Sequence, residues 1–153
     1  MLWFRTPQKV YFKKGCLPVA LREIQDVLHR KRAFLVTDEF LFKSGKMSCI
    51  TEPLQQMGIP YQVFSDVQSD PTLACAKEGA ELMRTFQPDV IIALGGGSAI
   101  DCAKGILSLA QSEARLVAIP TTSGTGSEVT SFSILTHEGV KHPLIDEALR
   151  PQL

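Results

Sequence analysis

The chain has 153 residues, 44% of them hydrophobic and 21% charged, which is enough for one domain with a substantial core. Its formal net charge is zero and its basic clusters are short, so nothing favours a nucleic-acid or membrane-surface partner. The sequence has no secretory leader pattern and no apolar run of about 20 residues, and these features predict a soluble cytoplasmic protein.

The first half of the chain alternates between apolar strand patterns and helical spacing. Aromatic-rich segments on either side of Thr6-Pro7 predict an N-terminal hairpin or edge strands, and Gly58 predicts the end of a helix. In chain order, the predicted elements are strands at 2–5 and 8–12, a helix at 17–29, a strand at 33–36, a helix at 44–57 and a strand at 61–64.

The second half continues the same alternation. Asp70-Pro71-Thr72 opens a helix, because proline is favoured in a first helical turn. The strand predicted at 89–94 is continuously apolar from Val90 to Leu94, which is typical of a strand buried on both faces. The further predicted elements are a helix ending near 86, a helix at 98–110, a strand at 116–119, and a hairpin of 129–135 with 140–145 around Glu138-Gly139.

Strands that alternate with helices predict an α/β fold with a doubly wound, mostly parallel, Rossmann-like sheet and an N-terminal edge hairpin. We expect residues 1–153 to form one dinucleotide-binding domain. Four widely spaced cysteines, with no C-x-x-C pair, favour free thiols over a zinc site or a disulfide framework. In such sheets ligands bind beyond the carboxyl ends of the strands.

Two loops follow predicted strands and carry the chemistry. Gly95-Gly96-Gly97-Ser98 precedes a helix, whose free N–H groups bind anions such as a pyrophosphate. The segment 120–128 holds five hydroxyl residues and two glycines, which suit a phosphate, ribose or amide. The alternative for the glycine run is a tight turn without a ligand. Neither loop has a Walker pattern, and no G-x-S-x-G nucleophile elbow exists.

Asp38 ends the predicted strand at 33–36. A carboxylate there accepts hydrogen bonds from an adenosine ribose and repels a 2′-phosphate, which favours NAD over NADP. The alternative is an aspartate that caps the next helix. The three histidines are dispersed and predict no metal site.

These motifs resemble those of the iron-dependent (group III) alcohol dehydrogenases. The matching segments are 36–38, 95–104 and 119–130, with a weaker match at 139–142; they occur in the family's order over nearly the whole chain. The resemblance extends only to the N-terminal, cofactor-binding half of that family. It implies that the family's C-terminal all-helical domain, which supplies an aspartate and three histidines for iron or zinc, is absent from this chain.

The resemblance also implies roles for single residues. Asp38 would hold the adenosine ribose, and Asp101 would order the glycine loop and face the nicotinamide side. The pyrophosphate cradle would be Gly95, Gly96, Gly97 and Ser98. The adenine and ribose wall would be Thr121 and Thr122, and the positions near the nicotinamide and its ribose would be Thr130, Phe132 and Lys141.

Two further positions receive structural roles. Lys104 is expected to brace its helix rather than to touch a ligand. Asp70 stands where the family often has Asn before proline, so its carboxylate either weakens cofactor binding or caps the helix.

The function implied is the NAD(P)-binding half of a metal-dependent dehydrogenase that interconverts a short-chain alcohol and its aldehyde. The family also implies a homo-oligomer. By itself this half is expected to be inactive, with no catalytic or metal residue of its own. Two alternatives stay open: a non-catalytic nucleotide-binding or interaction module, and an unrelated flavodoxin-like phosphate binder.

Overall fold

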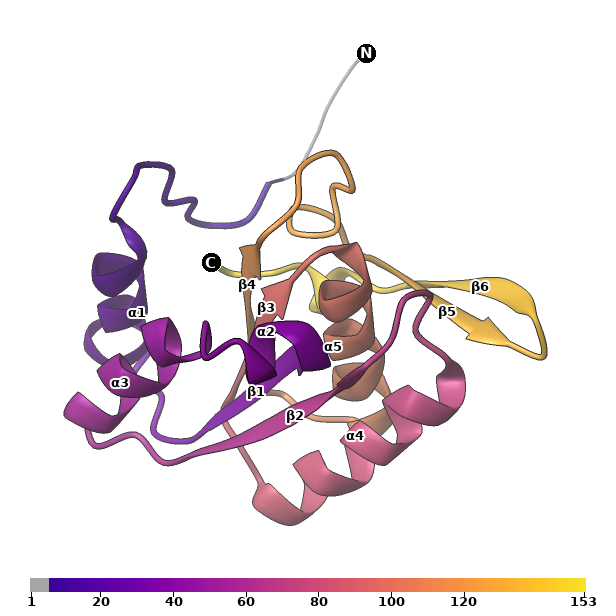
Figure 1. The fold of residues 1–153 in the computed structure, drawn as a ribbon, viewed down its shortest axis with the longest axis horizontal. Helices are drawn as coiled ribbons and strands as arrows, with labels where there is room; N and C mark the ends of the chain where they lie inside the picture. The colour runs from indigo at the N-terminus through magenta and orange to yellow at the C-terminus, as the bar shows by residue number, and fades with distance from the viewer. Residues whose placement is uncertain (1–5) are drawn as a thin grey trace.

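The computed structural model describes residues 6–153, which form a sheet with helices on both faces (Figure 1). Four parallel strands are hydrogen-bonded in the order β2-β1-β3-β4. Their bounds are β1 Ala33–Asp38, β2 Tyr61–Val67, β3 Val90–Gly95 and β4 Arg115–Pro120. The predicted doubly wound parallel sheet is therefore confirmed, and its strand order reverses between β1 and β3. Ligands of open α/β sheets bind beyond the strand ends at such a switch point.

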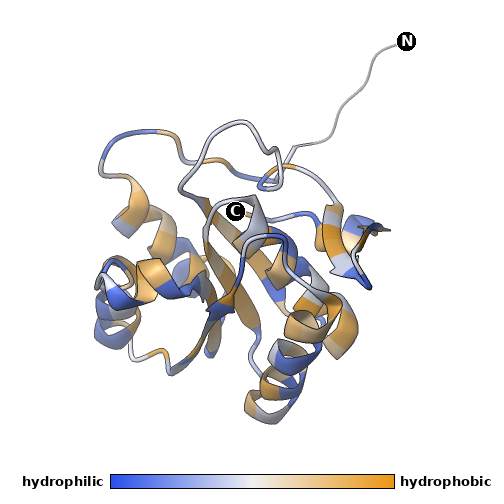
Figure 2. Ribbon diagram, turned by 45° about the vertical axis from the view of Figure 1, so that its right-hand side comes forward, coloured by the Kyte–Doolittle hydropathy of each residue, from blue (hydrophilic) through white to orange (hydrophobic). Residues whose placement is uncertain are grey.

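The helices cover the two faces of the sheet in pairs. On one face α1 (Leu17–Asp26) and α3 (Ser48–Gln56) pack against the sheet, and on the other α4 (Leu73–Phe86) and α5 (Gly97–Ala110) do so. Figure 2 shows the strands between them coloured as largely hydrophobic. This arrangement places the amino end of α5 directly after the carboxyl end of β3.

Alternating side chains of one strand build both cores, as the two-residue period of a β-strand requires. Phe34 and Val36 of β1 lie in the core beneath α4 and α5, whereas Ala33 and Leu35 lie in the core beneath α1 and α3. All four are fully buried. Within residues 6–153 no helix has the length and apolarity that crossing a membrane requires.

The predicted helix at 44–57 is wrong in its first part. The chain forms a short helix, α2 (Glu39–Lys43), and α3 begins only at Ser48. Asp38 caps α2, because the Leu41 amide donates to its Oδ1 at 2.8 Å. Gly45 then adopts a φ of +74°, which separates the two helices.

The predicted N-terminal strand at 8–12 is also wrong, because these residues form no strand. Its predicted partner in a hairpin, residues 2–5, lies outside the described residues. Two side chains of the segment 8–12 are held by Glu23 of α1 instead. Lys9 Nζ and Tyr11 OH each donate to that carboxylate at 2.7 Å. The segment thus lies against a helix rather than against a partner strand.

The predicted C-terminal hairpin is confirmed as β5 (Phe132–His137) and β6 (Val140–Ile145), which pair antiparallel. Glu138 and Gly139 both have positive φ, as two-residue hairpin turns favour. The hairpin packs on α5 through Leu135. A Cβ added to Gly105 would lie 2.7 Å from Leu135 Cδ1, so the glycine leaves the space that this side chain fills.

Lys104 attaches α5 to the segment that leads into this hairpin. Its side chain is fully buried, and its Nζ donates to the carbonyl oxygens of Ser127, Thr130 and Phe132 at 2.7, 2.7 and 2.6 Å. Burial lowers the pKa of the Lys104 ammonium to about 8, and the charge of Asp101 opposes this shift. The sequence predicted that Lys104 braces its own helix, whereas its ammonium braces the loop beside that helix.

We expect Lys104→Met to lower the free energy of unfolding by about 2 to 4 kcal/mol, because three buried carbonyls lose a charged donor. Urea denaturation of the chain measures this loss. Amide hydrogen exchange should also become faster in residues 127–132 than in the sheet.

Lys77→Met is the matched control, because Lys77 is exposed on α4. It should change stability by less than about 0.5 kcal/mol. Equal effects of the two substitutions would mean that the three hydrogen bonds contribute nothing to stability.

Candidate functional site

Three loops meet beyond the carboxyl ends of β1, β3 and β4. The Thr121 amide donates to the Gly95 carbonyl at 2.9 Å, and Gly95 is the register partner of Pro120. The loop after β4 therefore starts beside the glycine run after β3. Residues 121–125 of this loop are exposed.

Each glycine of the run faces a different neighbour. A Cβ on Gly95, where φ is +152°, would lie 2.6 Å from Ala99 Cβ and 3.6 Å from Asp38 Oδ2. A Cβ on Gly96 would lie 3.0 Å from Thr122 Oγ1. The glycine run therefore lies next to the aspartate after β1 and to the hydroxyl loop after β4.

The third glycine faces the same hydroxyl loop further along. A Cβ on Gly97 would lie 3.1 Å from Thr125 Cγ2 and 3.3 Å from Ser127 Oγ. Side chains at 96 and 97 would thus fill the space between the two loops. We call this space, bordered by Gly96, Gly97, Thr122 and Thr125, the glycine cradle.

The amino end of α5 opens at the glycine cradle. Gly96 is its N-cap, and neither a capping side chain nor an acidic residue neutralises its first turn in the described part of the chain. Ser98 lies half-buried in this turn. A 14-residue helix with an uncapped amino end favours a negatively charged group there.

Asp38 takes the capping role that the sequence offered as the alternative, and its carboxylate also lies beside the glycine run. Its Oδ1 caps α2, while its Oδ2 faces Gly95 across the switch point. The side chain is only half-buried, so one oxygen is engaged in the fold and the carboxylate still borders the site.

Asp101 lies one helical turn beyond the cradle and holds the hairpin. Its Oδ2 accepts from the Ile134 amide at 3.3 Å, and its carbonyl accepts from Ser133 Oγ at 2.7 Å. Burial raises the pKa of the Asp101 carboxyl, and its bonds to Ser127 and Ile134 oppose this. Its observed contacts order the start of β5.

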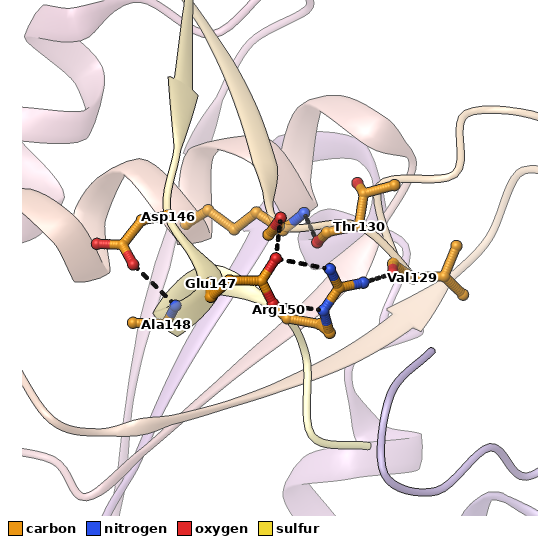
Figure 3. Close-up of polar contacts among 8 residues, drawn as sticks. Val129, Thr130, Asp146, Glu147, Ala148 and Arg150 are labelled. Carbon is orange, nitrogen blue, oxygen red and sulfur yellow. Dashed lines mark hydrogen bonds and ion pairs between the residues drawn. The ribbon is translucent and has the colours of Figure 1, made fainter. Parts of the chain in front are cut away.

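Thr130 and Phe132 contribute backbone carbonyls to Lys104, and the Phe132 side chain is 48% exposed. Arg150 holds the residue before them: its Nη1 donates to the Val129 carbonyl at 2.7 Å, as Figure 3 shows. Glu147 accepts from Arg150 Nη2 at 3.0 Å and from Ser131 Oγ at 3.3 Å.

Neither Arg150 nor Glu147 could be identified from the sequence. They lie 21 and 16 residues from the loop residues that they hold, and no motif marks them. The short helix η1 (Glu147–Leu149) places both side chains against the loop.

Asp70 and Lys141 form an ion pair at 2.7 Å, with 68% and 62% of their side chains exposed. The pair lies at the far end of the hairpin, because Lys141 pairs with Thr136, which forms a bridge to Thr72. Three residues of β5 lie between Thr136 and Phe132, which are about 13 Å apart along the strand. The structure thus brings these two predicted site residues together at the turn end of the hairpin.

A hollow of about 490 Å³ adjoins the loops, between the α2–α3 connection and the ends of β3 and β4. Its lining includes Leu41, Gly45, Leu94 and Thr121. A larger hollow, of about 630 Å³, lies at the amino ends of β3 and β4, near Asp89 and Arg115. The smaller hollow is lined by Leu94 at the end of β3 and by Thr121 after β4, and for this reason we assign it to the site.

Across residues 6–153 no three His, Cys, Asp or Glu side chains are close enough together to hold a metal ion. The rings of His137 and His142 lie 6.3 Å apart on the hairpin.

Several known proteins are similar to this chain in sequence or in structure. Bifunctional aldehyde-alcohol dehydrogenase AdhE of Escherichia coli strain K12 is 41% identical over the whole of this chain, which spans 20% of that relative. The structure of 1,3-propanediol oxidoreductase is 30% identical with a TM-score of 0.91, over 99% of this chain and 44% of that one.

A sulfoacetaldehyde reductase from Bifidobacterium kashiwanohense, solved in complex with NAD+, is 27% identical. Its TM-score is 0.85 over 99% of this chain and 45% of its own length. The chain therefore spans a fifth to less than half of the length of these relatives.

The family profile described as iron-containing alcohol dehydrogenase matches residues 7–153. With the glycine run, the hydroxyl loop and Asp38 gathered at the switch point of a matching fold, the chain belongs to the iron-containing alcohol dehydrogenase family.

Proposed function

We propose that this chain is the coenzyme-binding part of an NAD-dependent alcohol dehydrogenase that interconverts a short-chain alcohol and its aldehyde. The observation that carries this proposal is the glycine cradle, where any side chain at 96 or 97 would meet the hydroxyl loop. The relative solved in complex with NAD+ supports the choice of a dinucleotide.

The residues around the cradle fit a dinucleotide in three respects. The uncapped amino end of α5 favours the pyrophosphate, and the glycines allow it to approach the backbone. Asp38 lies beside Gly95, next to the cradle, and is suited to the ribose hydroxyls. The hollow beside Leu41, Leu94 and Thr121 offers apolar surface for the adenine ring.

The nicotinamide end would face the segment that Lys104 and Arg150 hold. These cations fix the carbonyls of Val129, Thr130 and Phe132, so that wall of the site is preorganised. When bound, a nicotinamide would supply the hydride acceptor, and a metal held outside residues 1–153 would supply a Lewis acid for the alcohol oxygen. We propose that residues 1–153 contribute the coenzyme site alone.

We expect the purified 153-residue chain to form no NADH from ethanol or 1-propanol when iron or zinc is added. The described residues hold no group of three metal-ligating side chains. Absorbance of NADH measures turnover, with a full-length relative as the positive control. Metal-dependent NADH formation by this chain would contradict the expectation.

We expect NAD to raise the unfolding temperature of the chain, since a ligand at 100 times its Kd adds about 2.7 kcal/mol of stability. Gly97→Val should reduce this shift by more than half, because the new side chain fills the cradle near Thr125. A thermal unfolding scan with and without NAD measures both effects.

Ser108→Val, at the opposite end of α5, is the control and should keep the full shift. If NAD has no effect on the unmodified chain at millimolar concentration, the coenzyme proposal fails. If FMN stabilises the chain instead, the flavodoxin-like alternative gains support.

We expect Asp38→Asn to raise the affinity for NADP relative to NAD at least tenfold, which is about 1.4 kcal/mol. The substitution removes the negative charge that would face a 2′-phosphate and keeps a good helix cap. Titration calorimetry with both coenzymes measures the ratio. Asp146→Asn is the control, since Asp146 caps η1 away from the cradle; an equal change in both variants would argue against a ribose role for Asp38.

A further inference from the structure

Two cysteines face each other where α4 and α5 cross. The Sγ atoms of Cys75 and Cys102 lie 3.9 Å apart, although 27 residues separate them in sequence. Small residues allow this close approach: a Cβ on Gly105 would lie 3.3 Å from Ala76 Cβ, and a Cβ on Gly79 would lie 2.4 Å from Ile106 Cδ1. The sulfur pair therefore sits at a close-packed helix crossing.

The two thiols have unequal surroundings. Cys102 is fully buried, whereas Cys75 is half-buried and can be reached from solvent. The hydrogen bond from Cys102 lowers the pKa of the Cys75 thiol, against desolvation and the charges of Glu78 and Asp66. The same contact and burial raise the pKa of Cys102. One sulfur is thus suited to react first and the other to react with it.

We propose that Cys75 and Cys102 are a redox pair that forms a reversible intramolecular disulfide when a hydroperoxide oxidises Cys75. The Cys75 thiolate attacks the peroxide, the O–O bond breaks, and Cys75 becomes a sulfenic acid while the other oxygen leaves as water or alcohol. The Cys102 sulfur then attacks the Cys75 sulfur, the S–O bond breaks, and water leaves with the thiol proton. Two thiols are oxidised by two electrons and one peroxide is reduced.

The geometry requires only a small closure. A disulfide has its sulfurs about 2.05 Å apart, so side-chain rotation must bring them about 1.9 Å closer. The remaining cysteines offer no such partner: among residues 6–153, Cys75 with Cys102 is the only pair of cysteine sulfurs within hydrogen-bonding distance. Cys49 is exposed as a residue, but partial burial of its thiol raises the pKa of that thiol. A smaller fraction of it is therefore present as the reactive thiolate.

The test treats the reduced chain with hydrogen peroxide, blocks the remaining thiols and maps the peptides by mass spectrometry. We expect one linked peptide pair, Cys75 with Cys102, which dithiothreitol converts back to free thiols. Cys102→Ser should stop at a Cys75 sulfenic acid, which dimedone traps, and Cys75→Ser should form no intramolecular disulfide.

Cys49→Ser is the matched control and should form the same linked pair at the same rate. If Cys102→Ser does not fold, as judged by thermal unfolding, Cys102→Ala serves in its place. Peroxide that oxidises Cys49 or Cys16 while Cys75 stays reduced would overturn the proposal, as would a disulfide between two copies of the chain. This redox test needs no coenzyme, so its failure leaves the proposed coenzyme site unaffected.

Discussion

The candidate site depends on the buried ammonium of Lys104. A charge without partners in such a place would be very costly, and three carbonyl oxygens at 2.6 to 2.7 Å supply them. Because Lys104 belongs to α5, the helix that opens the glycine cradle also fixes the segment that leads into β5. The two sides of the site therefore share one rigid support, and neither can shift without breaking buried hydrogen bonds.

A second cation completes this support from the end of the chain. Arg150 binds the carbonyl of Val129, next to the Thr130 carbonyl that Lys104 binds. The segment between β4 and β5 has no regular structure, so its carbonyls find few backbone N–H partners. Lysine and arginine suit such a segment because they donate several hydrogen bonds and accept none. The tail continues along β4, where the Gln152 amide donates to the Leu116 carbonyl at 2.8 Å.

Patterns that are local in sequence predicted most of this fold. The buried runs of β1, β3 and β4 and the Glu138-Gly139 turn were found because burial and turn chemistry act over a few residues. Helix α2 was missed, since five residues are too few to show a helical period. The N-terminal hairpin was predicted from aromatic residues, but Glu23 holds Lys9 and Tyr11 instead. Such long-range contacts leave no trace in a local pattern, and the same holds for Arg150.

Some glycines of this chain can be assigned a role from the sequence alone, because they form a motif. Others have a role that only the packing reveals. Gly96 and Gly97 stand in a run after a strong strand, so the sequence marked them, and the structure places them against the hydroxyl loop. Gly79 and Gly105 are single residues within helices and look incidental, yet they let α4, α5 and Leu135 meet. The helix α5 therefore takes part both in this crossing and, at its amino end, in the glycine cradle. Side chains that do not border the cradle, such as Ile106 and Leu135, thus pack the helix that opens it.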